Sequence, residues 1–130
     1  MIDLKRLTAD DAHALELELA RLRSDVARLE SRERQLRESA RPDAQELRAV
    51  TRELNEVAAR LAALDGDPRG LAIRRAATEQ RLDAYARLLK ELDAQPGRQD
   101  DAEQVRRWQA RDRERLAELA RRIGGTARRN

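Results

Sequence analysis

The chain has 130 residues, of which 40% are hydrophobic and 41% are charged, and its net charge is +3 at pH 7. Cysteine and phenylalanine are absent, and Trp and Tyr occur once each, so the composition excludes disulfides and thiolate metal sites and disfavours a sheet built on aromatic residues. Leu, Ala, Arg and Glu dominate instead, and because all four favour helices we expect an all-α protein.

The first expected helix spans residues 8–40, with Thr8 as its N-cap. Its aliphatic residues recur in steps of three and four, which average the spacing of about 3.5 residues that is typical of a left-handed coiled coil. Glu33 stands where this pattern expects an apolar side chain. A polar residue at such a position commonly lowers stability while it fixes register or partner number.

The second expected helix spans residues 43–64 and keeps the same heptad phase. Pro42 lies between the two segments, and it either kinks one long helix or lets the chain reverse into a hairpin. In both arrangements the heptad residues form one helix–helix seam. This seam comprises Leu15, Leu19, Leu22, Val26, Leu29, Leu36, Leu47, Val50, Leu54, Val57, Leu61 and Leu64.

Residues 65–68, with the sequence Asp-Gly-Asp-Pro, predict a helix end with a left-handed Gly66 and a new helix that begins at Pro68. The third helix is expected over residues 68–94. Its apolar face is wider than that of the first two segments, which indicates contact with more than one neighbour. This face comprises Leu82, Tyr85, Leu89 and Leu92, with Ala77, Ala84 and Leu88 beside them.

Pro96 and Gly97 break the third helix, and a fourth helix is expected over residues 100–123. Gly124 is expected to end this helix, because glycine commonly takes the left-handed conformation that closes a helix. The remaining residues 125–130 would then form a flexible basic tail.

Asp100 and Glu103 form an acidic version of the capping box at the start of the fourth helix. Val105 and Trp108 continue it with apolar side chains. Residues 109–115 are nearly all polar, and we therefore expect the loosest packing of the molecule there.

These segments predict antiparallel helical hairpins with coiled-coil packing, in a single domain of residues 1–124. Two architectures satisfy the pattern. If Pro42 and Pro96 kink their helices, the chain forms one long antiparallel hairpin. If the chain reverses at both prolines, it forms a compact up-down four-helix bundle.

Nothing in the sequence assembles a catalytic or metal centre. His13 is the single histidine, and its position among acidic residues is typical of an exposed surface side chain. Since there is also no calcium-type loop and no Gly-rich loop ahead of a helix, we expect no enzymatic activity, no cofactor and no metal. We expect a cytoplasmic location, because no segment has the roughly 20 apolar residues needed to cross a bilayer and the N-terminus lacks a secretory signal pattern.

A nucleic-acid-binding surface is the alternative that the charge distribution supports. Basic residues concentrate in the last quarter of the chain, where Trp108 could stack on a base, although Asp112 and Glu118 interrupt the basic face. The candidate contacts to RNA or DNA are Arg106, Arg107, Arg111, Arg121, Arg122, Arg128 and Arg129.

The opening segment Met1-Ile2-Asp3-Leu4-Lys5-Arg6-Leu7 resembles the start of bacterial seryl-tRNA synthetases. This resemblance covers seven residues and implies an antiparallel helical hairpin that grips tRNA. The acidic segment around Asp43 and Glu46 is similar to the tip of coiled-coil factors that enter the RNA polymerase channel. The small β domain that anchors such factors has no counterpart in this sequence.

The sequence therefore favours a non-enzymatic structural or interaction protein that docks a partner helix or a second copy of itself. An assembly factor, an adaptor, a chaperone-like component and a secretion or phage component all fit this description. We expect no membrane and no small-molecule substrate among its partners.

Overall fold

The computed structural model describes residues 11–129, with side chains as far as residue 125, and shows four helices and no strand in this part of the chain. The all-α fold class with antiparallel helical hairpins is thereby confirmed. The chain divides into two compact units, the first containing His13–Asp67 and the second containing the segment from Pro68 onwards. Each unit is one hairpin. The predicted cap Thr8 lies outside the described residues.

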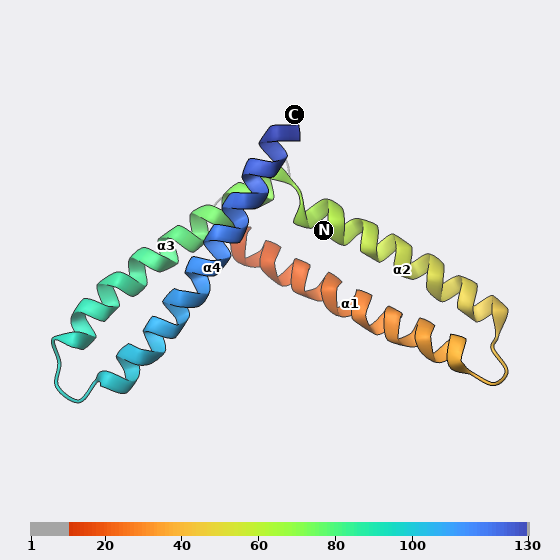
Figure 1. The fold of residues 1–130 in the computed structure, drawn as a ribbon, viewed down its shortest axis with the longest axis horizontal. Helices are drawn as coiled ribbons and strands as arrows, with labels where there is room; N and C mark the ends of the chain where they lie inside the picture. The colour runs from red at the N-terminus through yellow and green to blue at the C-terminus, as the bar shows by residue number, and fades with distance from the viewer. Residues whose placement is uncertain (1–10, 130) are drawn as a thin grey trace. The chain divides into compact units, whose positions relative to one another are not determined.

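The first hairpin consists of α1 (Ala12–Glu38) and α2 (Ala44–Asp65), which run antiparallel on either side of a short loop (Figure 1). Pro42 lies in this loop, so the chain reverses there and does not continue as a kinked helix. The next residue, Asp43, is the N-cap of α2. Its carboxylate accepts hydrogen bonds from the backbone N–H groups of Gln45 and Glu46, at 3.0 and 3.2 Å.

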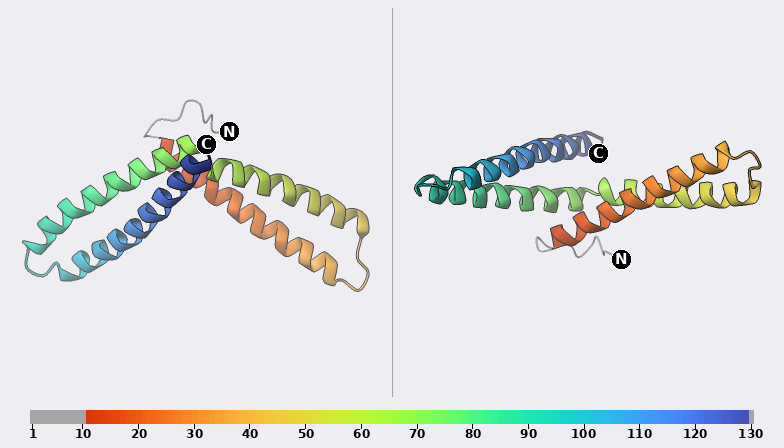
Figure 2. Two further views of the ribbon diagram at one scale, coloured as in Figure 1. Left: turned by 45° about the horizontal axis from the view of Figure 1, so that its top comes forward. Right: turned by 90° about the horizontal axis from the view of Figure 1, so that it is seen from below.

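The second hairpin consists of α3 (Pro68–Asp93) and α4 (Gln99–Arg129), which lie side by side in both views of Figure 2. α3 begins at Pro68, whose fixed φ suits a first helical turn and whose missing N–H leaves no donor unpaired there. Gly97 turns the chain toward α4 with φ +81°, a conformation that costs glycine little because it has no Cβ.

Three helix ends differ from the sequence-based expectation. Gly66 caps α2 with φ −95°, a right-handed conformation, and its N–H donates to the carbonyl of Ala62 at 3.0 Å. α4 begins at Gln99, so Asp100 lies in the first turn and does not act as the N-cap. α4 also continues past Gly124 to Arg129, because a helical glycine costs only about 1 kcal/mol and no proline follows to stop the helix.

The continuation of α4 means that the backbone of residues 125–129 is helical, whereas we expected a flexible tail there. The core of the second hairpin near its loop is small. Leu92, Ala102 and Val105 are buried in it, and Tyr85 and Leu89 pack against them while remaining partly exposed.

Candidate interaction surfaces

The predicted seam residues of α1 are deeply buried. Leu15 and Leu19 are fully covered, and Leu22, Leu29 and Leu36 have at most 7% of their surface exposed. Each lies three or four residues, or a multiple of this spacing, from the next, so together they occupy one stripe of the helix. Val26 belongs to the same stripe and is half-buried.

The predicted seam residues of α2 are only half-buried, and none of the 22 residues of this helix is fully buried. The partly exposed members are Leu47, Val50, Leu54, Val57, Leu61 and Leu64. The two helices thus differ in how completely their aliphatic stripes are covered. Part of the α2 stripe remains open to solvent.

Polar contacts connect α1 and α2 along the hairpin. Arg23 forms an ion pair with Asp65 at 3.3 Å, and Arg32 pairs with Glu46 closer to the loop. Arg23 lies in the first half of α1 and meets the last residue of α2, whereas Arg32 lies near the end of α1 and meets the first turn of α2, as an antiparallel arrangement requires. Both ion pairs are exposed to solvent, so each contributes only about 0.2–1 kcal/mol to the stability of the hairpin.

Glu33 is the polar residue that interrupts the seam of α1. Its carboxylate accepts a hydrogen bond of 2.8 Å from the hydroxyl of Thr51 on α2, and it lies 3.6 Å from the guanidinium of Arg37. The side chain of Glu33 is 22% exposed, so its charge keeps contact with water. The hydrogen bond to Thr51 ties Glu33 to one position along α2 and thereby helps fix the register of the hairpin.

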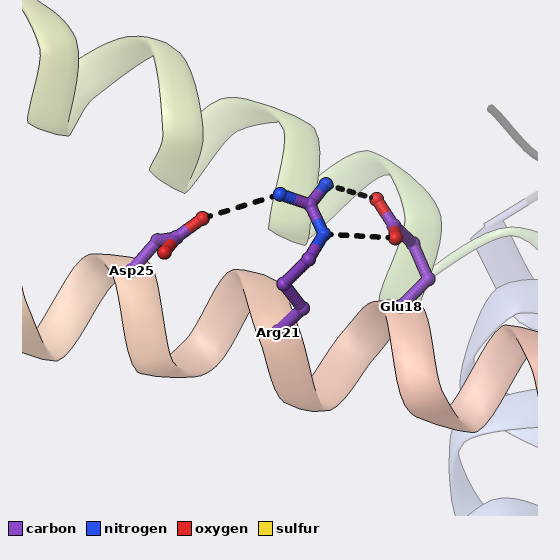
Figure 3. Close-up of polar contacts among 3 residues, drawn as sticks. All are labelled: Glu18, Arg21 and Asp25. Atoms are coloured by element: carbon purple, nitrogen blue, oxygen red, sulfur yellow. Dashed lines mark hydrogen bonds and ion pairs between the residues drawn. The ribbon is translucent and has the colours of Figure 1, made fainter.

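A second polar cluster lies within α1 itself. Arg21 donates two hydrogen bonds to Glu18, at 2.5 and 3.0 Å, and one of 3.4 Å to Asp25 (Figure 3). The hydrogen bond from Arg21 lowers the pKa of Glu18, and the same bond raises the pKa of Arg21. All three residues come from neighbouring turns of one helix, so the cluster stabilises α1 locally.

An open groove of about 730 Å³ follows the surface of α2. Leu47 and Thr51 form the side of the groove next to the seam, and Arg48 and Arg52 lie farther around the helix. The other lining residues are Arg37, Asn55, Glu56 and Ala59. The groove therefore places charged groups of both signs beside Leu47, the first residue of the aliphatic stripe of α2.

The α3–α4 hairpin contains a buried polar network that the sequence reasoning missed. Asp112 is 7% exposed and accepts a hydrogen bond of 3.0 Å from Arg81. Arg81 also donates to the hydroxyl of Thr78, which in turn donates to the backbone carbonyl of Arg74. The expectation of loose packing over residues 109–115 is wrong at Asp112, because the carboxylate finds a guanidinium on the facing helix.

The same hairpin exposes two large apolar side chains near its loop. Trp108 on α4 is 40% exposed and Leu88 on α3 is 38% exposed. The ring of Trp108 lies against that of Tyr85, with 6.1 Å between the ring centroids. A pocket of about 220 Å³ lies between the two helices at this point, lined by Leu88, Leu92, Arg98, Asp101, Gln104, Val105 and Trp108.

The predicted nucleic-acid contacts are spread around α4, and carboxylates neutralise part of them. Arg106 forms two hydrogen bonds of 2.9 Å with Asp93, and Arg121 pairs with Glu118 at 2.5 Å. Arg107 makes only a long contact of 3.5 Å with Gln104.

Of the remaining predicted contacts, Arg111 is exposed and Arg122 is half-buried. Arg128 and Arg129 lie on the last turns of α4, beyond the described side chains. The arginines therefore do not form one continuous basic face in the described part of α4.

Within residues 11–129, no helix carries an apolar stretch long enough to span a membrane. The same part of the chain contains no group of three or more His, Asp or Glu side chains placed to hold a metal ion. No protein-family model, curated protein or solved structure matches this chain.

Proposed function

We propose that this protein is a non-enzymatic interaction module that works through helix–helix contacts, and that its α1–α2 hairpin associates with a second copy of itself through α2. The observation that supports this proposal is the difference in burial between the two helices. The seam leucines of α1 are covered, whereas the six seam residues of α2 are each left partly in water.

Covering the α2 stripe would be energetically favourable. Full burial of an exposed Leu or Val side chain contributes about 1.5–3 kcal/mol, and because these six residues are already more than half covered, completing the burial of each is worth less than about 1 kcal/mol. Six such residues in each of two copies would together contribute several kcal/mol toward the entropic cost of bringing two molecules together.

A second copy suits this surface because α2 is self-complementary. Its aliphatic stripe would meet an identical stripe across a two-fold axis, which is the commonest symmetry of protein dimers. Arg48 and Arg52 lie in the first half of α2, and Glu53 and Glu56 follow them. An antiparallel pairing of two copies of α2 with its two-fold axis at Leu54 would place Arg52 of one copy opposite Glu56 of the other.

Sedimentation velocity of the full chain tests the proposal. We expect the wild-type protein to associate, the Leu54→Asp variant to be monomeric and the Ala49→Asp variant to behave as wild type. Ala49→Asp is the matched control, because it introduces the same charge on α2 at an exposed position outside the groove and on the other side of the helix from Leu54. Leu22→Asp places the charge at a buried position, so it should cost helicity as well.

Circular dichroism of each variant separates loss of association from loss of folding. If Leu54→Asp also loses helicity, Val57→Thr provides the milder test, since it adds a hydroxyl at similar volume on the half-buried stripe. A wild-type protein that remains monomeric at every concentration would refute self-association, as would a Leu54→Asp variant that still associates.

A further inference from the structure

The pocket beside Trp108 is the feature that points beyond self-association. It lies between α3 and α4 near their loop, with Leu88, Leu92, Val105 and Trp108 as its apolar lining. The polar residues at its edge include Arg98 and Asp101, which pair with each other at 2.7 Å. The polar side chains Arg98 and Asp101 thus have partners, whereas Leu88 and Trp108 in the apolar lining remain partly exposed to solvent.

The size of the pocket indicates what fits it. Small-molecule sites commonly enclose about 300–1,000 Å³, whereas this pocket is open and measures about 220 Å³. Such a volume suits one large aliphatic side chain. Exposed Trp residues in shallow apolar pockets are also the residue type most enriched among the energetic centres of protein–protein interfaces.

The charged residues around the pocket indicate which charges a binding partner would carry beside the side chain that it inserts. Arg111 lies one helical turn beyond Trp108, and among the described residues its side chain has no hydrogen-bond or ion-pair partner. Arg107 is next to Trp108 and makes only the 3.5 Å contact with Gln104. Asp112, which follows Arg111 in the sequence, is buried against Arg81 and does not neutralise Arg111.

We infer that the α3–α4 hairpin binds an amphipathic helix of another protein, which inserts a large aliphatic side chain beside Trp108 and places acidic residues against Arg107 and Arg111. Two antiparallel helices form a groove that accepts a third helix. The apolar lining of the pocket suits a peptide side chain better than a nucleic-acid backbone, whose affinity comes mainly from phosphate contacts. This inference extends the proposed function to the second hairpin and does not require the α2 surface.

Fluorescence titration tests it directly, because Trp108 is the single tryptophan of the chain. The probes are two designed amphipathic peptides of about 20 residues, long enough to form a helix, without Trp and with the same leucine stripe. One carries Glu beside the leucines and the other carries Lys. We expect the Glu peptide to shift Trp108 emission to the blue and to bind at least about tenfold more tightly than the Lys peptide.

Variants locate the binding site. Leu88→Ser should weaken binding of the Glu peptide by about tenfold or more while keeping the fluorescent reporter. Leu17→Ser is the control, because Leu17 is 58% exposed and belongs to the other hairpin. Arg111→Glu should remove the preference for the Glu peptide. All three changes are at exposed positions, and circular dichroism should show unchanged helicity.

Three outcomes would overturn the inference. The first is equal affinity for the Glu and Lys peptides, and the second is unchanged binding of the Glu peptide by Leu88→Ser. The third is that single-stranded poly(U), and not the Glu peptide, shifts the emission of Trp108. The Leu54→Asp variant keeps this test separate from that of the proposed function. Its α3–α4 hairpin should bind the Glu peptide as the wild type does, whether or not α2 mediates self-association.

Discussion

Asp43 illustrates how one side chain determines where a helix begins. Pro42 restricts the residue before it and cannot donate a hydrogen bond, so the chain leaves the helical conformation in this loop. Asp43 then satisfies two of the first free N–H groups of α2, those of Gln45 and Glu46. Glu46 adds a negative charge near the positive end of the helix dipole.

Replacing Asp43 with Ala should lower the free energy of unfolding of the first hairpin by about 1 kcal/mol, because two backbone donors lose their acceptor. Thermal unfolding followed by circular dichroism measures this change. Gln45→Ala is the control, since its side chain makes no capping bond in α2, and it should leave the stability within about 0.5 kcal/mol of wild type. Equal effects of the two variants would argue against the cap.

The pair of Glu18 and Arg21 makes a prediction about pH. Because the hydrogen bond from Arg21 lowers the pKa of Glu18, the ionised pair stabilises the folded state above the ordinary pKa range of glutamate. This contribution is lost as the pH falls through the lowered pKa. Arg21→Gln should therefore raise the pKa of Glu18 toward its ordinary value.

Carboxyl NMR titration of Glu18 in the wild type and in Arg21→Gln measures this shift. Asp25→Asn is the matched control, because Asp25 contacts Arg21 but not Glu18 and its loss should leave the pKa of Glu18 nearly unchanged. An unchanged pKa of Glu18 in Arg21→Gln would show that the pair does not persist in solution. The effect on stability should be small, since both side chains are solvent-exposed.

At the scale of helices, each hairpin combines an apolar stripe with one polar contact across the pair. Thr51 donates to Glu33 in the first hairpin, and Arg81 donates to Asp112 in the second. The second contact is the more buried, with the side chain of Asp112 only 10% exposed. A buried polar contact restricts the register of two helices more than it stabilises them.

Asp112→Ala should destabilise the second hairpin by about 1–2 kcal/mol, because it leaves the guanidinium of Arg81 without its carboxylate. The loss stays at the lower end of the range for buried charges since Arg81 is 41% exposed and can turn to water. Chemical denaturation measures the change. Asp101→Ala removes an exposed partner of Arg98 and should cost less, about 0.5 kcal/mol.

The double variant Asp112→Leu with Arg81→Met provides a further check on this network. Replacing both charged groups with apolar side chains removes the unpaired charge, so stability should return toward that of the wild type. If the double variant were less stable than Asp112→Ala, the network would contribute more than the contact between Arg81 and Asp112.

For the whole molecule, self-association through α2 would link stability to protein concentration. Binding of a second copy to the folded state adds up to about 1.4 kcal/mol for each tenfold rise in concentration. We therefore expect the Tm of the wild type to rise with concentration and the Tm of Leu54→Asp to stay constant. Calorimetry over a wide concentration range measures both, and a constant wild-type Tm would contradict the proposal.

The sequence by itself determined the helices and the residues that form their apolar stripes. Helix propensity, prolines and heptad spacing act locally. Pro68 therefore predicts the start of α3, and the spacing of the seam leucines predicts the buried stripe of α1. The same local signals were insufficient at Gly66 and Gly124. Glycine permits a left-handed conformation without requiring it, and only Gly97 adopts one in the described part of the chain.

Only the tertiary structure decided which predicted residues are covered. Pro42 is compatible with both a kink and a reversal, and the contacts between α1 and α2 accompany the reversal. Asp112 is buried although it lies in a nearly all-polar stretch, and Trp108 is 40% exposed although it continues the apolar residues of α4. The physical reason is that the exposure of a side chain depends on the helix that lies over it, and the residue's own segment carries no record of that neighbour.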